Sequence, residues 1–193
     1  MFKGLSLFTI SKLDGIVNCV RKNEVMDSVK ELLTMAFNLD ERSVALLWLN
    51  SKVGIPYKWG GNNELEGFDC SGFVLQWLRS FTRFAIGDMT AQGIHNFLTE
   101  DNPSFVRELD LRGEDKICFG DILFYGESLQ KINHVSIGIS ENLVIEAGGG
   151  GSTVKTKKTA TAYNAMVRIR PDGHRMDMIA AIRHKYYVWD KVF

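Results

Sequence analysis

The chain has 193 residues, 45% of them hydrophobic, so it is long enough to bury a core without disulfides or a structural metal. Its 23 basic and 23 acidic residues cancel, so no overall charge attracts it to nucleic acid or a membrane surface. Three cysteines do not make a disulfide framework and suit synthesis in a reducing compartment. No segment is apolar enough to span a bilayer, and residues 2–20 lack the cleavage site of an export signal. We therefore expect synthesis in the cytoplasm without a signal peptide.

The first forty-odd residues are predicted to be helical. Apolar residues with a 3.6-residue period run from Val25 to Phe37, and Asn38 marks a stop. A second helix, starting at Asp40 or Ser43, is expected to end before Gly54. We interpret residues 1–43 as an N-terminal helical extension. Its first part, residues 1–38, is expected to cover part of the core, to occlude a cleft or to dock to a partner.

Cys70 stands between a glycine-rich loop and an amphipathic helix. The apolar residues that follow it at helical spacing are Phe73, Val74, Trp77, Leu78 and Phe81. A thiol in the first turn of a helix meets unpaired N–H groups and the positive end of the helix dipole, and both stabilise a thiolate. Asp69 can cap the helix, but its charge opposes a neighbouring thiolate, so a cationic partner is also expected. Cys70 is therefore predicted to be a nucleophile.

His134 begins a predicted strand and is the expected partner of Cys70. Aliphatic residues alternate with smaller or polar ones over residues 135–139, and residues 143–147 alternate too. A short turn between them makes an antiparallel hairpin, in which Glu146 shares the face of His134. Depending on register, Glu146 is either the diagonal neighbour of His134 or lies directly across from it. The three residues are predicted to act as nucleophile, base and orienter.

The remaining segments are expected to complete one domain. A short helix near Ala91–Thr99 is expected to line one wall of the cleft, and the run Gly148–Ser152 indicates a mobile loop, a backbone that a ligand can approach, or an ordinary turn. Residues 153–157 and 167–170 are predicted strands with basic exposed faces. Residues 176–193 mix helical periodicity with aromatic side chains that should pack on the core. Three histidines without ligand spacing are interpreted as surface or structural residues: His95, His174 and His184.

Four blocks in order resemble the NlpC-type cysteine peptidases of bacterial cell-wall metabolism. They are Tyr57–Gly61, Phe68–Val74, Phe119–Tyr125 and His134–Ile139. The resemblance implies an α+β, papain-like fold in which the nucleophile lies on a helix packed against a central antiparallel β-sheet that carries the histidine. It also implies hydrolysis of amide bonds in peptidoglycan stem peptides, typically γ-D-glutamyl-diamino acid bonds.

The same resemblance assigns roles to individual residues. It implies that three residues shape the pocket and hold the stem peptide: Tyr57, Asp69 and Ser71. The third polar residue of the catalytic set is usually a histidine in this family, whereas the matching position here holds Glu146. Because a carboxylate can also orient an imidazole, the predicted catalytic set is Cys70, His134 and Glu146.

The expected organisation is a helical extension over residues 1–43, a papain-like cysteine peptidase domain over 44–175 and an aromatic tail over 176–193. Neither metal-ligand spacing nor a phosphate loop is present, so we expect no metal and no cofactor. Two alternatives stay open: a non-catalytic structural or wall-binding component, such as part of a phage tail, and a papain-like acyltransferase or thioesterase. An enzyme of the wall made without a signal needs a virion, holin-type release or a specialised secretion system for delivery.

Overall fold

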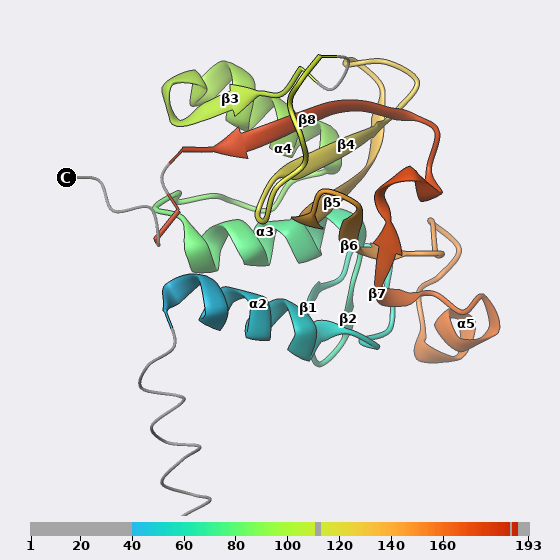
Figure 1. Cartoon of the computed structure of the whole chain (residues 1–193). Coiled ribbons are helices and arrows are strands. Elements are labelled where there is room, and N and C mark those ends of the chain that lie inside the picture. Colours follow the sequence, from blue (N-terminus) through green and yellow to red (C-terminus); the bar gives the residue numbers. More distant parts are fainter. Residues whose placement is uncertain (1–39, 111–112, 186, 189–193) are drawn as a thin grey trace, which may run out of the picture. The chain divides into compact units, whose positions relative to one another are not determined.

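A six-stranded antiparallel sheet and the helix α3 (Cys70–Phe81) form the core of the structure. The structure is a computed structural model that describes residues 40–110, 113–185 and 187–188. Figure 1 shows α3 lying between the sheet and α2 (Glu41–Lys52). The expected α+β fold, with the nucleophile helix packed on an antiparallel sheet, is confirmed. The proposed roles of residues 1–38 lie outside the described residues.

Helix α3 forms because apolar side chains recur along one of its faces. Its buried residues include Phe73, Trp77 and Phe81. The ring of Trp48 in α2 stacks on Phe73, with ring centroids 6.2 Å apart, and meets Phe81 edge-on at 5.6 Å. These aromatic contacts hold the two helices together and fix the orientation of α3. The second predicted helix is thus confirmed and leads directly into the loop around Tyr57.

The sheet has the strand order β3-β8-β4-β5-β6-β7. Its strands are β3 (Val106–Glu108), β4 (Ile122–Gly126), β5 (Ile132–Ser140), β6 (Leu143–Gly148), β7 (Met166–Pro171) and β8 (Met178–His184). A separate pair, β1 (Asn62–Asn63) and β2 (Gly67–Phe68), precedes α3. Strands β5 and β6 form the predicted hairpin between β4 and β7, and helix α3 packs against both.

Short helices connect these strands. They are α4 (Ala91–Asn96), the π-helix η1 (Phe97–Asp101), the 3₁₀ turns η2 (Pro103–Phe105) and η3 (Asp172–His174), and α5 (Lys157–Ala162). The short helix expected near Ala91 is therefore present. No helix among the described residues combines the length and the apolarity that crossing a membrane requires.

Two predicted elements differ from the structure. Residues 153–157 are not a strand: the Val154 side chain is fully buried in a loop, and the Thr156 hydroxyl accepts a hydrogen bond from the Thr159 N–H at the start of α5. A capping box thus outweighs the alternation of apolar and polar residues. The helical periodicity after residue 176 is also misleading, because Met178–His184 forms β8, which fills the sheet between β3 and β4.

Candidate active site

Cys70 is the first residue of α3, and Asp69 caps the helix. The Asp69 carboxylate accepts hydrogen bonds from the Gly72 N–H at 2.7 Å, the Ser71 hydroxyl at 2.9 Å and the Gly60 N–H at 2.9 Å. A Cβ on Gly72 would stand 2.1 Å from the carbonyl oxygen of Gly61, so only glycine permits this approach of helix and loop. The capping carboxylate therefore fixes the position of the thiol against the preceding loop.

Strands β5 and β6 present the other two predicted catalytic residues. The register pairs Ile137 with Ile145 and Gly138 with Val144. Continued along the strands, this register makes Glu146 the diagonal neighbour of His134, which is one of the two expected arrangements. Both side chains are buried, with His134 7% and Glu146 3% exposed.

The structure brings Cys70, His134 and Glu146 together. The Nε2 atom of His134 lies 2.6 Å from Oε2 of Glu146. The side chain of Cys70 interacts with that of His134 and raises the pKa of the imidazole. Because Nε2 is engaged by the carboxylate, Nδ1 is the ring nitrogen left for the thiol. Three separate elements, α3, β5 and β6, thus supply a thiol, an imidazole and a carboxylate in one chain of contacts.

The charges in this arrangement stabilise one another. Burial lowers the pKa of His134, but hydrogen bonds and charges from Cys70 and Glu146 outweigh burial and raise that pKa to about 9. Burial raises the pKa of Glu146, but His134 and His174 outweigh it and lower that pKa to about 2. At neutral pH, His134 is therefore an imidazolium and Glu146 a carboxylate, and the imidazolium can stabilise a thiolate on Cys70.

His174 is a further residue of this site that sequence analysis did not place there. Its Nε2 lies 3.1 Å from Oε2 of Glu146, and its Nδ1 lies 2.8 Å from the carbonyl oxygen of Pro171. His174 therefore links the Glu146 carboxylate to the backbone at Pro171. Glu146 is thus held between the two imidazoles of His134 and His174. The turn η3, which carries His174, follows a long connection through α5 and β7, so no sequence spacing pointed to this contact.

A cleft of about 410 Å³ opens over these residues. It is lined by Tyr57, Trp59, Cys70, Asn133, His134, Glu146, Ala147, Gly148, Gly149, Gly150, Gly151, Arg170, His174 and Arg175. Burial and the nearby charges of Cys70 and Asp69 raise the pKa of Tyr57, so its hydroxyl stays neutral and can donate a hydrogen bond. A Cβ on Gly150 would stand 2.1 Å from the ring of Tyr57, so only glycine allows the loop to pass this close to the ring.

The predicted substrate-binding residues are divided between two hollows. Tyr57 lines the cleft of Cys70, whereas Asp69 and Ser71 line an adjoining hollow of about 280 Å³. Trp59 lines both and is 51% exposed, so it stands between them at the surface. The hollow also contains Asp88, just ahead of α4. Among the residues the structure describes, no cluster of three or more potential metal ligands is present.

Comparison with known proteins agrees with this geometry. A model of the NlpC/P60 family matches residues 54–170. The chain is 27% identical over 121 residues to the probable endopeptidase YafL of Escherichia coli strain K12, covering 62% of this chain and 45% of YafL. It is 33% identical over 101 residues to the bifunctional muramidase/DL-endopeptidase CwlT of Bacillus subtilis strain 168, covering 51% of this chain and 26% of CwlT. The chain therefore spans less than half the length of these relatives.

A solved structure shows the same fold. The crystal structure of the NlpC/p60 domain of the peptidoglycan hydrolase SagA superimposes with a TM-score of 0.51 at 22% sequence identity. The match covers 74% of this chain and 98% of the SagA chain. At this identity the likeness concerns the arrangement of helices and strands.

Proposed function

Since the chain belongs to the NlpC/P60 family, we propose that it is a cysteine peptidase that hydrolyses amide bonds in peptidoglycan stem peptides. The observation that carries the proposal is the contact of His134 with both Cys70 and Glu146. The finer part of the proposal is the bond between γ-D-glutamate and a diamino acid. The names of relatives, a probable endopeptidase and a DL-endopeptidase, support this class of reaction.

The geometry supports a mechanism through a thioester. The thiolate of Cys70 attacks the scissile carbonyl carbon, and the N–H of Cys70 stabilises the oxyanion because the first turn of a helix has no acceptor for it. His134 then passes its proton to the nitrogen, the C–N bond breaks and the amine leaves. Water attacks the thioester and gives a proton to His134. The C–S bond breaks, releasing the acid and restoring Cys70.

A digestion of purified peptidoglycan tests the proposal. We expect soluble fragments with a new amine on the diamino acid and a new γ-carboxyl on D-glutamate, both identifiable by mass spectrometry. Walls with lysine and walls with diaminopimelate should be compared, because either diamino acid can follow the D-glutamate. The chain with Cys70→Ala serves as the inactive control. Binding to the wall without fragments would instead indicate the non-catalytic alternative, and fragments cut at another bond would correct the assigned bond.

Glu146 stands where the family usually has histidine, and we expect it to orient and charge His134. In Glu146→Gln the amide keeps the shape but loses the charge, so turnover should fall about 10- to 100-fold. The pKa of His134, about 9 in the native chain, should fall, so the alkaline limb of the pH–rate profile should move to lower pH.

Two further substitutions complete the test of Glu146. The chain with Glu146→His should keep activity near the starting level, because histidine restores the family's usual residue. Unchanged turnover and an unchanged pH–rate profile in Glu146→Ala would show that Glu146 does not orient His134.

A further inference from the structure

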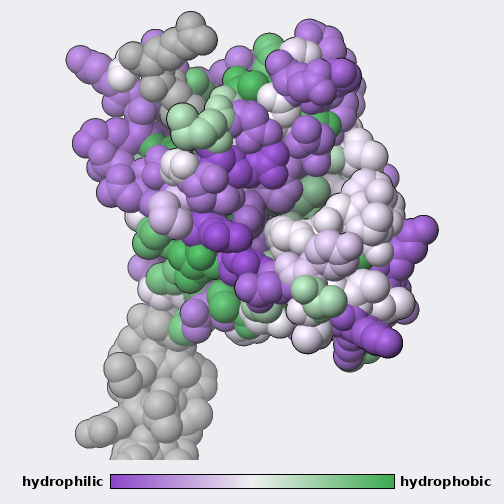
Figure 2. Space-filling model, turned by 90° about the vertical axis from the view of Figure 1, so that its right-hand side faces the viewer, coloured by the Kyte–Doolittle hydropathy of each residue, from purple (hydrophilic) through white to green (hydrophobic). Residues whose placement is uncertain are grey.

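Two arginines of β7 lie on the same side of the sheet as Glu146. The register places Arg168 opposite Glu146 and Arg170 opposite Val144, so both arginines share the face of the carboxylate. Figure 2 shows the side of the molecule on which β7 and α5 lie, and hydrophilic residues gather across the middle of this face. The basic residues predicted for β7, Arg168 and Arg170, lie next to the carboxylate of Glu146 in the sheet.

These guanidinium groups have buried donors without partners. Among the described residues, Nε and Nη2 of Arg168 and Nε of Arg170 are buried and have no hydrogen-bond acceptor. The contact of Arg170 Nε with Oε1 of Glu146 is 3.7 Å, which is too long for a hydrogen bond. A buried charged donor without an acceptor costs free energy. The described residues supply no acceptor for these donors, so a ligand or water would have to satisfy them.

The charge of the cleft points to an anionic acceptor. Among the described residues that line the cleft, Glu146 is the sole carboxylate, and it already contacts His134 and His174. Arg175 also lines the cleft, but Asp177 holds its guanidinium through two hydrogen bonds of 2.9 and 2.6 Å. Arg170 has no hydrogen bond of this kind, because Oε1 of Glu146 lies 3.7 Å from its Nε, and its side chain is 39% exposed. A planar guanidinium with free donors matches a carboxylate well.

The position of Arg170 identifies the part of the substrate that it meets. The leaving amine must take its proton from His134, so the residue that carries this amine lies on the His134 side of Cys70. Arg170 lies on the same side of the cleft as His134, because its Nε is 3.7 Å from Oε1 of Glu146 and Glu146 contacts His134. The adjoining hollow carries carboxylates instead, from Asp69 and Asp88. The two hollows thus differ in the sign of their charge, with guanidinium groups in the cleft of Cys70.

We propose that Arg170 forms a binding subsite for the carboxylate of the amino acid that is released as the leaving group. This inference rests on the proposed function, in which that amino acid is the diamino acid of the stem peptide. In a stem peptide that ends at this residue, its α-carboxylate is free and stands one carbon from the scissile nitrogen. Arg168 supports the subsite from behind: a Cβ on Gly149 would stand 3.5 Å from its Nη2, so its guanidinium lies against the glycine run that lines the cleft.

The test compares matched peptides on the native chain and its variants. The substrates are L-alanyl-γ-D-glutamyl-lysine and L-alanyl-γ-D-glutamyl-diaminopimelate, each beside the form in which the carboxyl of the leaving residue is a carboxamide. We expect the native chain to lose about 10- to 100-fold in kcat/KM when this carboxylate is amidated. Arg170→Gln should lose a similar factor on the free acid and show no preference between acid and amide. Arg170→Lys should keep part of the preference, because it keeps the charge without the planar donors.

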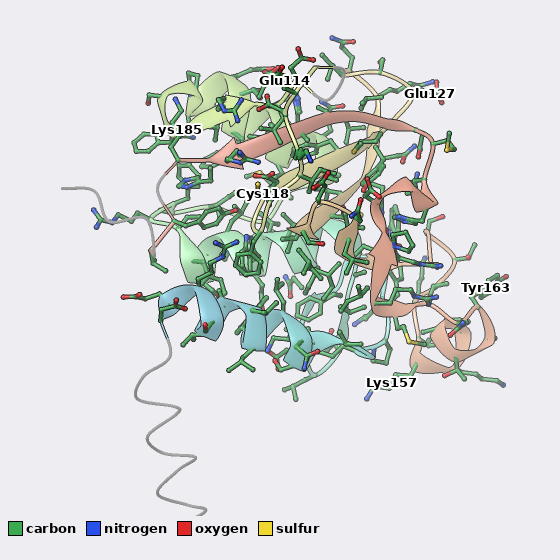
Figure 3. The ribbon with its side chains drawn as sticks, viewed as in Figure 1. Glu114, Cys118, Glu127, Lys157, Tyr163 and Lys185 are labelled. Carbon is green, nitrogen blue, oxygen red and sulfur yellow. The ribbon has the colours of Figure 1, made fainter. Side chains whose placement is uncertain are left out.

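Controls separate binding from effects on Glu146. Lys157→Gln removes a charge at the start of α5, where Figure 3 labels Lys157, and should keep the full preference because Lys157 is not among the residues that line the cleft. The alkylation rate of Cys70 in Arg170→Gln should stay at the native value. An equal loss on acid and amide peptides, with slower alkylation, would overturn the subsite and assign Arg170 to the support of Glu146. A third peptide, with D-isoglutamine in place of D-glutamate, removes the carboxylate on the acyl side.

The outcomes distinguish this inference from the proposed function. Arg170→Gln could still prefer the acid over the amide at the leaving residue but no longer distinguish D-glutamate from D-isoglutamine. That result would overturn the placement of the carboxylate on the leaving residue, because Arg170 would then bind the carboxylate on the acyl side. Cleavage of acid and amide peptides at equal rates by the native chain would overturn the subsite alone. If the native chain cleaves none of the peptides and releases no fragments from the wall, the proposed function fails, and the subsite fails with it.

Discussion

Replacing Cys70 with alanine is expected to reduce hydrolysis of wall peptides below detection, while the fold stays intact. The thiol supplies the bond-forming electron pair, and no other described residue in the cleft is a thiol. Cys70 is partly exposed at the first position of α3, and its removal leaves the buried apolar face of the helix unchanged. We therefore expect the free energy of unfolding to change by about 1 kcal/mol or less. Release of new amines from the wall and urea unfolding measure the two effects.

Cys118 offers a matched control for this substitution. It is a free, exposed cysteine ahead of β4, and Figure 3 shows it among the labelled residues. Cys118→Ala should keep full activity, and an electrophilic thiol probe at neutral pH should label Cys70 in preference to Cys118. Hydrolysis that persists in Cys70→Ala would overturn the cysteine mechanism.

Replacing His134 is expected to have an equally large effect. In His134→Ala, turnover should fall about 1,000-fold or more, because both the cation beside the thiolate and the acid for the leaving amine are lost. Alkylation of Cys70 should slow sharply near neutral pH. In the native chain the imidazolium persists up to its pKa of about 9, so fast alkylation of Cys70 should extend across neutral pH and turnover should fall as the pH rises through 9.

A second variant separates the loss of the imidazole from the effects of unfolding. His134 is 7% exposed, so alanine leaves a cavity, whereas His134→Gln fills most of the space without an ionisable group. Both variants should lose activity and should show the same slow alkylation. Native alkylation rates in a folded His134→Gln chain would show that another group is the cationic partner of Cys70.

Much of the site could be predicted because its residues lie on locally determined elements. The apolar period after Cys70 and the capping Asp69 define a helix start within a few residues of sequence. The alternation around His134 and Glu146 defines a hairpin, and burying both aliphatic sets restricted its register to two choices. The two registers differ in turn geometry, and the structure adopts the register with an irregularity between Gly138 and Ser140.

The parts that could not be predicted depend on contacts between distant segments. His174 reaches Glu146 from a short 3₁₀ turn after β7, and no periodic pattern marks such a turn. The strand β8 carries apolar residues at spacings that also suit a helix, and its pairing with β3 and β4 determines its conformation. The orphan donors of Arg168 and Arg170 became visible only once β6 and β7 were in register.

The place of β8 in the sheet imposes an order on biosynthesis. Strand β4 pairs with β5 on one side and with β8 on the other, yet β8 follows all other described strands along the chain. While the ribosome is still adding residues 178–184, β4 has an open edge and β3 has no neighbour. An open edge can recruit strands from other chains. Until that strand emerges, the hairpin that carries His134 and Glu146 lies in an unfinished sheet. The sheet around the candidate site is therefore completed only after most of the chain has been made.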